Sequence, residues 1–309
     1  MGSMVMEAQT RDFLSRHQLP TGDGPSSKPS LRAFRDGGRF GVEISSVNNA
    51  TILRTVLRLA KKHSVRVNRC DECRGMVRLP HADATEMLRI CAGEGIGLLL
   101  SVGPRATYDT GGFVRSQNGQ RMGYRLRGMA SVIHAVDEVR RMAELGARGF
   151  LVNDEGLLLL LGQLRQAGEL PASTVFKVSV HMGCSNPLSA RLFESLGANT
   201  INPVPDLDLG MLSAMRAAVH CPLDLFSDTA EEAGGLVRTH DVPDFVRLAS
   251  PVYIKCGAKS QVRQNHLPST GELRERMRQT ACVLEMLARH DLAGTQVGPT
   301  EPTLGLPEL

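Results

Sequence analysis

Residues 144–153 read ELGARGFLVN, the end of a helix followed at once by a buried strand. Glycine is the residue type that most often ends a helix in a left-handed turn, and the GFLV run after it is short and apolar. The same junction recurs as GEGIGLL at 93–99 and SLGANT at 195–200. Strands of a parallel sheet are buried on both faces and read as nearly continuous apolar runs. The repeated junction therefore predicts helices alternating with parallel strands.

Eight strands of this kind are expected, each followed by a stretch with apolar residues at helical spacing. They are RFGVEIS (39–45), SVRVNR (64–69), GIGLLLSV (95–102), GARGFLVN (146–153), TVFKVSV (174–180), ANTINPV (198–204), PLDLFS (222–227) and PVYIKC (251–256). Eight strand–helix repeats predict an α/β fold, a single-domain TIM-type (β/α)8 barrel. A doubly wound open sheet is the alternative, but it normally has a glycine-rich nucleotide turn after its first strand, which EISSVNNA (43–50) is not.

The composition of the sequence argues against several classes of protein. The 309 residues carry a net charge of +4, from 36 basic and 32 acidic residues, which favours small anionic ligands over nucleic acid. No apolar run approaches the ~20 residues of a membrane helix. Seven cysteines without small-domain spacing argue against a disulfide framework and for a reducing cytoplasm. We expect a partly disordered arm at 1–30, the barrel at 31–292 and a disordered tail at 293–309.

In such barrels the active site lies at the C-terminal ends of the strands. Candidates for proton transfer and related chemistry there are Glu43, Asp154, His181 and Lys255. Glu43 should point into the barrel, where pairing with Lys177 or Lys255 is as plausible as catalysis. Lys255 could form a Schiff base, but an anion clamp or a salt bridge is the favoured role. Histidine side chains ordinarily titrate near neutrality, which suits His181 for acid–base work, although a structural histidine is equally plausible.

The loop after the third strand, 103–129, contains five arginines among its glycines and predicts an anion-binding lid. A solvated flexible loop is the alternative. A second, smaller lid is expected at 230–238. The residues expected to bind substrate on this face are Arg69, Arg105, Asp109, Arg125, Asn186, Asn202 and Arg238.

Four of the seven cysteines lie at expected strand ends: Cys70, Cys73, Cys184 and Cys256. This exceeds chance, and thiolates are the ligands that zinc and iron–sulfur clusters prefer. A 4Fe–4S cluster is therefore expected first, zinc second, and an empty site third. The objection is that the fifth strand lies across the barrel mouth from the second and eighth.

Several stretches resemble the collagenase-like peptidases of unassigned catalytic type, family thirty-two, especially small barrel-only bacterial members. The resemblance covers about 31–290, and it is carried by FGVEISSV, VGPRATYDTG, KVSVHMGCSNP, GANTINPVPDLDL, AEEAGGLVRTHDVPDFVRLASPVYIKCG and LPSTGEL. It implies a TIM-type barrel. Some branches of the family carry out oxygen-independent hydroxylation of quinone precursors or transfer RNA with a four-cysteine 4Fe–4S cluster. Their cysteine arrangement differs from this one, and the further domain of their longer members is not expected in this chain.

The leading expectation is a barrel enzyme acting on a small carboxylate- or phosphate-bearing metabolite, with redox, hydroxylation or lyase-type chemistry at a cysteine-ligated centre. A peptide or amide hydrolase, as the family name suggests, is one alternative. No zincin or nucleophile-elbow motif supports hydrolysis. A non-catalytic barrel that binds a partner enzyme is the other alternative. A homo-oligomer is also possible.

Overall fold

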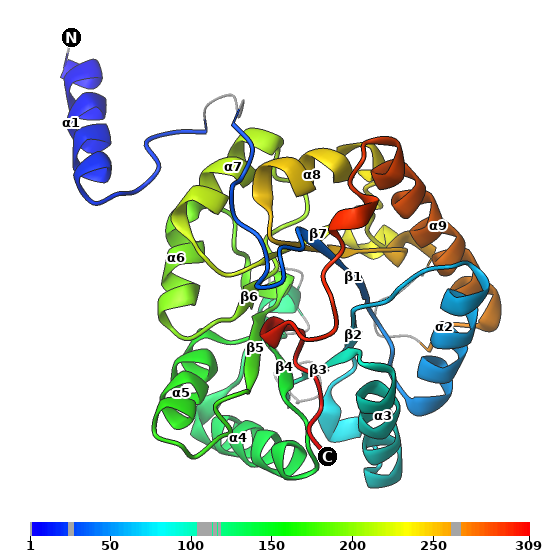
Figure 1. Ribbon diagram of the computed structural model, residues 1–309. Helices are drawn as coiled ribbons and strands as arrows, with labels where there is room; N and C mark the ends of the chain where they lie inside the picture. Colours follow the sequence, from blue (N-terminus) through cyan, green and yellow to red (C-terminus); the bar gives the residue numbers. More distant parts are fainter. Residues whose placement is uncertain (1, 24–27, 104–112, 114–115, 117–118, 261–266) are drawn as a thin grey trace.

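The computed structural model describes residues 2–23, 28–103, 113, 116, 119–260 and 267–309. Its eight strands pair in sequence order, all parallel, and β8 pairs with β1, so the sheet is a closed barrel (Figure 1). The strands are β1 Phe40–Ile44, β2 Arg69–Glu72, β3 Gly97–Ser101, β4 Gly149–Val152, β5 Val175–Val178, β6 Thr200–Ile201, β7 Leu223–Phe226 and β8 Val252–Lys255. The predicted barrel is confirmed.

Helices surround the barrel, and their apolar sides pack on the outward-facing strand residues. They are α2 Ala50–Lys62, α3 His81–Glu94, α4 Gly128–Glu144, α5 Glu155–Gln166, α6 Pro187–Ser195, α7 Leu209–Ala218, α8 Val242–Ala249 and α9 Thr270–Arg289. Among the described residues, no helix is long and apolar enough to cross a membrane.

The second strand lies further along the chain than the sequence predicts. The expected strand at 64–69 meets β2 only at Arg69, and the polar segment Arg69–Glu72 forms the strand instead. All four of its residues are buried. The prediction followed apolar alternation, whereas here charged residues face other charged residues inside the barrel. Cys70 and Asp71 are therefore strand residues and not part of a loop.

The C-terminal segment 293–309 is ordered, so the expectation of a disordered tail is wrong. Val297 and Leu304 are fully buried, and the Val297 amide donates to the Phe40 carbonyl at 2.7 Å. The segment crosses the N-terminal end of the barrel (Figure 1). We call residues 296–308 the plug.

Glycines on the strands and in the plug allow the two to approach closely. A Cβ on Gly97 would lie 2.0 Å from the Leu304 carbonyl oxygen, and a Cβ on Gly305 would lie 2.9 Å from the Gly149 Cα. On β8, the Tyr253 hydroxyl and Thr303 Oγ1 share a hydrogen bond of 2.7 Å. The plug thus covers the N-terminal end of the barrel, where it packs on strand side chains such as that of Tyr253.

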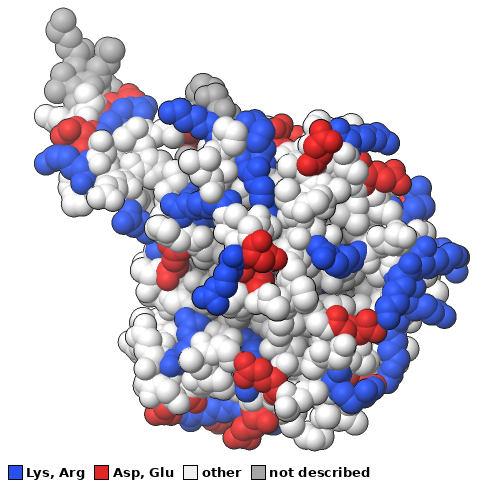
Figure 2. Space-filling model, in the orientation of Figure 1, with Lys and Arg blue, Asp and Glu red and all other residues white. Residues whose placement is uncertain are grey.

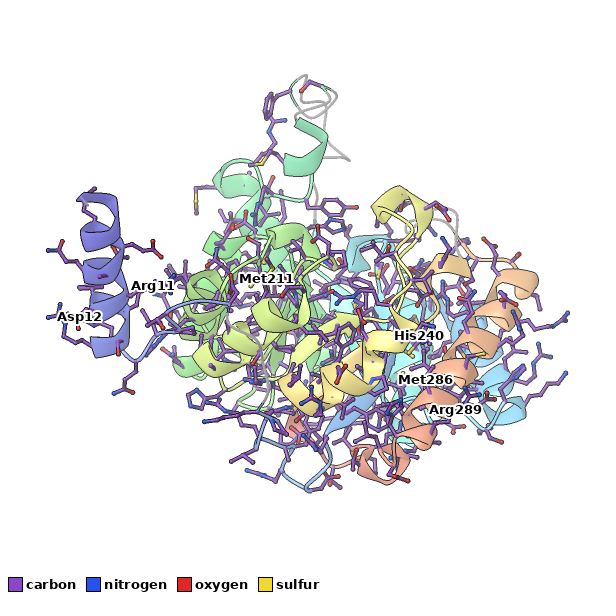
Figure 3. All side chains as sticks on the ribbon, turned by 90° about the horizontal axis from the view of Figure 1, so that it is seen from above. Arg11, Asp12, Met211, His240, Met286 and Arg289 are labelled. Carbon is purple, nitrogen blue, oxygen red and sulfur yellow. The ribbon has the colours of Figure 1, made fainter. Side chains whose placement is uncertain are left out.

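The N-terminal arm is partly ordered. Residues Gly2–Arg16 form helix α1, which stands away from the barrel, with Arg11 and Asp12 labelled on it (Figures 1 and 3). Further on, the Ser30 amide donates to the Arg247 carbonyl at 2.8 Å, which fixes the chain against α8. Figure 2 shows basic and acidic side chains interspersed on the plug side of the molecule, without a continuous basic face.

Candidate active site

The barrel interior holds six charged side chains that meet in one cluster, which we call the ionic centre. It consists of Glu43, Arg69, Asp71, Lys177, Asp224 and Lys255. Strand alternation aims them inward from β1, β2, β5, β7 and β8, and each is at most 3% exposed. Three acids face three bases, so the centre is formally neutral.

Each acid of the ionic centre contacts more than one base. Arg69 donates from Nε to Glu43 at 2.6 Å and from its NH2 nitrogen to Asp224, also at 2.6 Å. Lys177 binds Glu43 and lies 3.0 Å from Asp71. A buried ion pair is tolerated only when its remaining bonding capacity is satisfied, and this network satisfies it.

Lys255 is the member of the ionic centre that lies beside Phe226, a residue of the mouth pocket. Its Nζ lies 2.9 Å from Glu43 and from Asp71, and 4.9 Å from the centre of the Phe226 ring. Phe226 in turn lines the mouth pocket described below. The ammonium group therefore lies next to a ring that lines the pocket.

The two acids beside Lys255 differ in proton affinity. Burial alone would raise the pKa of Glu43, yet the charges of Arg69, Lys177 and Lys255 hold it well below its ordinary value. For Asp71, burial and the neighbouring Glu43 outweigh the lysines and raise the pKa. Burial opposes the charged form of Lys255, but Asp71 and Glu43 raise its pKa, so it stays protonated. Asp71 accepts a proton more readily than Glu43.

A pocket of about 600 Å³ opens at the C-terminal mouth of the barrel, within the size range of ligand sites. Its wall is mostly apolar, with a few polar groups. The lining residues are Ser45, Ser46, Val180, His181, Val204, Pro205, Asp206, Phe226, Thr229, Ala230, Glu232, Ala233, Gly234, Leu236 and Ala258. They follow β1, β5, β6, β7 and β8, so five strand ends meet around one space.

Two polar features of the pocket stand out. The Ser45 hydroxyl is buried, and the described residues offer it no hydrogen-bond partner. The His181 ring stacks on Tyr124, with centroids 3.6 Å apart and planes 7° apart. Tyr124 belongs to the long loop after β3, so that loop reaches the pocket wall. Ser46 adopts a left-handed backbone, with φ 61°, a strained conformation that is frequent at functional sites.

Several predicted site residues have structural partners instead. Asp154 and Asn186 cap the N-termini of α5 and α6 through their side chains. Arg125 pairs with Glu155 at 2.6 Å and donates to the Asn153 carbonyl at 2.9 Å.

Arg238 and Asn202 are likewise occupied. Arg238 pairs with Asp241 at 2.8 Å and donates to the Leu207 carbonyl at 2.6 Å. Asn202 donates to the Asp224 carbonyl at 2.7 Å. Arg69 lies deep in the ionic centre and away from the mouth. Arg105 and Asp109 lie outside the described residues, as does most of the expected lid.

The four strand-end cysteines do not form a metal site. Among the described residues, no group of three or more histidine, cysteine or acidic side chains lies close enough to hold a metal ion. Cys70 belongs to the apolar packing between barrel and helices, near Cys91. Burial also raises the pKa of Cys184, to about 12, which opposes thiolate formation. These residues do not fit a four-thiolate cluster.

The residues CDEC instead hold the turn after β1. The backbone amide of Ser46 donates to the Cys73 thiol. The Cys73 amide donates to Asn48 Oδ1 at 2.9 Å, and the Val47 amide donates to the Asp71 carbonyl at 2.8 Å. This segment fixes the strained turn that places two serines in the pocket wall.

Sequence reasoning placed Glu43, His181 and Lys255 near the barrel mouth or interior, but it missed Asp71 and Ser45 as site residues. Had the second strand been predicted to end three residues later, at Glu72, Asp71 would have been a strand residue. Because it lies two positions after Arg69, its side chain would then have been expected on the same inward face. No sequence signal identifies the unpartnered hydroxyl of Ser45, because it depends on contacts between distant segments.

A scan against protein-family models finds no match for this chain, and a search of curated proteins finds none either. Among solved structures it is similar to a U32 peptidase, at 18% identity over 66% of this chain and 74% of that one, with a TM-score of 0.42. It is also similar to an archaeal fructose 1,6-bisphosphate aldolase, at 15% identity over 81% and 97% of the two chains, with a TM-score of 0.42. A phospho-2-dehydro-3-deoxyheptonate aldolase from Thermotoga maritima matches at 12% identity over 84% and 71%, with a TM-score of 0.49. At these values the likenesses assign no activity, and it is the closed strand order that identifies the chain as a TIM-type barrel.

Proposed function

We propose that the chain is an enzyme that binds a small metabolite with an apolar body and an anionic group in the mouth pocket. One observation carries the proposal: the apolar pocket of about 600 Å³ at the C-terminal mouth of the barrel is lined by Ser45, whose buried hydroxyl has no hydrogen-bond partner among the described residues. Buried polar groups are nearly always satisfied, so an unsatisfied one in a pocket wall favours a ligand there.

The chemistry that this arrangement supports is proton transfer next to a developing negative charge. His181 lines the pocket and is the candidate acid–base group, with its ring held by Tyr124. Lys255 would supply a fixed positive charge behind the Phe226 side of the pocket, which would stabilise an enolate or a similar anion. Schiff-base chemistry is disfavoured, because its neighbours hold Lys255 in the protonated form while a nucleophilic amine must lose its proton.

A blocked pocket tests the binding part of the proposal. Ala233 is exposed at the pocket rim, so Ala233→Trp fills the pocket without a buried clash. Ala167→Trp, at the exposed end of α5, is the matched control. We expect native mass spectrometry to find one or more components of a metabolite mixture retained by the wild type and the control but lost from Ala233→Trp. Equal retention by all three proteins would refute the pocket.

A second experiment tests the chemistry. His181→Gln should retain the captured metabolite but convert it about 100-fold more slowly, or more slowly still, since positioned acid–base groups contribute about 10²–10⁴ in rate. Unchanged turnover would remove His181 from the mechanism.

One observation favours a second candidate, the partner-binding barrel. Leu188 and Leu192, one turn apart on α6, are each 53% exposed, and Leu159 on α5 is 44% exposed. An outer apolar surface is typical of a protein interface. Replacing Leu188 and Leu192 by Gln should then disperse a complex or oligomer on size-exclusion chromatography and leave metabolite capture unchanged.

A further inference from the structure

Arg276 is a buried cation beside the pocket wall. It extends from α9 to the ends of β1 and β8, with the side chain almost fully buried. Its Nε donates to the Gly257 carbonyl at 3.2 Å, and its NH1 nitrogen donates to the carbonyl of Ser45. Arg276 thus binds the main chain of Ser45, a residue of the pocket wall.

The chain makes room for this guanidinium at a specific position. Gly257 has φ 74°, and a Cβ there would lie 2.2 Å from the Arg276 Cγ. Any larger residue at the end of β8 would collide with the arginine stem and would also be strained by the backbone. The close approach requires a glycine.

The hydrogen-bonding capacity of Arg276 is not filled. Its NH2 nitrogen is buried and has no partner among the described residues, and no ion pair to a carboxylate is formed within them. Burial lowers the pKa of Arg276 to about 10, against the charge of Asp228. Asp228 itself accepts from the amides of Gly257 and Lys259, at 2.7 and 2.8 Å, and holds the same chain segment.

Two hydrogen-bond donors without an acceptor therefore lie in one region, where the end of β8 meets the end of β1. We call this region the seam. One donor is the Ser45 hydroxyl and the other is the Arg276 NH2 nitrogen, and a hydrogen bond to the Ser45 carbonyl joins the two residues. A buried guanidinium without a carboxylate partner favours an incoming anion, because the anion supplies both the missing charge and the missing acceptors.

We infer that the anionic group of the pocket ligand, a carboxylate or a phosphate, binds at this seam and accepts hydrogen bonds from Ser45 and Arg276. The inference rests on the proposed function, since it needs a ligand in the mouth pocket. It replaces the arginines that the sequence suggested: Arg125 and Arg238 already have carboxylate partners. The apolar pocket wall then holds the body of the ligand.

Two fluorescent probes of the same ring system separate the anion subsite from the pocket. The anionic probe is 8-anilinonaphthalene-1-sulfonate, and the neutral probe is N-phenyl-1-naphthylamine. Each is titrated into the full chain, with and without inorganic phosphate as a competing anion. The variants are Ser45→Ala, which removes the hydroxyl, and Arg276→Lys, which keeps the charge but removes the planar donors.

Arg216→Lys is the matched control. Arg216 is also buried with unpartnered nitrogens, but it lies before β7 near the opposite end of the barrel and donates to the Val219 carbonyl. Thermal unfolding of every variant identifies a folding defect. If Arg276→Lys fails to fold, Ser45→Ala still decides the question, because it removes only one hydroxyl group.

The expected result is that Ser45→Ala and Arg276→Lys weaken the anionic probe about tenfold or more and leave the neutral probe within twofold. Arg216→Lys changes neither, and phosphate competes with the anionic probe alone. If the variants bind the anionic probe as tightly as the wild type, the seam is not an anion site while the pocket stands. If neither probe binds the wild type, the proposed pocket and the subsite both fail.

Discussion

At the scale of single residues, the ionic centre shows how charged side chains in a barrel core depend on one another. Glu43 contacts three bases at once, so its removal leaves positive charge buried without compensation. The alternation of Val42, Glu43 and Ile44 predicts the inward direction of this carboxylate from sequence alone. Its partners could not all be predicted, since Arg69 and Asp71 follow an apolar stretch that carries the stronger strand pattern.

Glu43→Gln should therefore lower the free energy of unfolding by about 3–5 kcal/mol, the typical effect of breaking a buried pair. Glu94→Gln is the control, because Glu94 pairs with Lys61 on the surface and such pairs contribute less than about 1 kcal/mol. Urea unfolding of both variants measures the difference. Equal losses would contradict a tightly coupled ionic centre.

Two cysteines in the same strand region should respond in opposite ways. Cys73 accepts a hydrogen bond from the Ser46 amide, so Cys73→Ser retains an acceptor while Cys73→Ala leaves the amide unsatisfied, at about 1–3 kcal/mol. Cys70 packs among apolar side chains, so Cys70→Ala should be milder than Cys70→Ser. Thermal melts of the four variants test this reversal. The same order at both positions would mean that Cys73 does not hold the turn.

At the scale of elements, the strands are easier to predict than the plug, which covers the N-terminal end of the barrel. Apolar runs locate seven of the eight strands, three of them after a glycine at the preceding helix end, because burial on both faces leaves a direct mark on composition. The plug has no such mark: GTQVGPTEPTLGLPEL is rich in proline and glycine, and only Val297 and Leu304 within it are fully buried apolar residues. Its order comes from contacts with the distant strands β1, β3 and β8.

Gly97→Ala tests the fit of the plug. The new Cβ would lie 2.0 Å from the Leu304 carbonyl oxygen, so we expect a loss of about 1–3 kcal/mol through overpacking. The Leu98 amide, which donates to Gly305, should also exchange its hydrogen faster. Gly93→Ala, on α3 with open space around it, should be neutral or stabilising. A plug that tolerates the added methyl group on β3 without faster exchange would be only loosely docked.

At the scale of the whole molecule, the two ends of the barrel are built differently. The N-terminal end is filled by the plug, while the C-terminal end opens into the mouth pocket. The mouth pocket follows from the barrel fold, in which catalytic groups gather at the C-terminal strand ends. The identity of its wall does not, because His181, Ser45 and Leu236 come together only through loops whose paths depend on contacts such as Arg276 with Ser45.

The overall packing predicts a simple thiol titration. Of the seven cysteines, Cys282 on α9 is exposed. The others are buried or half-buried, and burial raises the pKa of each of these thiols. Ellman's reagent at pH 8 should therefore modify one thiol quickly in the folded protein and all seven in denaturant. Loss of the fast phase in Cys282→Ser confirms the assignment, whereas two or more fast thiols would contradict the packing.

The plug also governs where water can reach the ionic centre. Because Thr303 and Leu304 cover the N-terminal end of the barrel, we expect solvent to approach the buried Lys255 and Asp71 from the mouth side. A ligand bound in the mouth pocket would block the same route. If the proposed proton transfer takes place there, a hydrogen ion taken from the bound ligand would have no bulk water to exchange with and would return to the same molecule. In heavy water, we then expect the substrate to keep its own hydrogen.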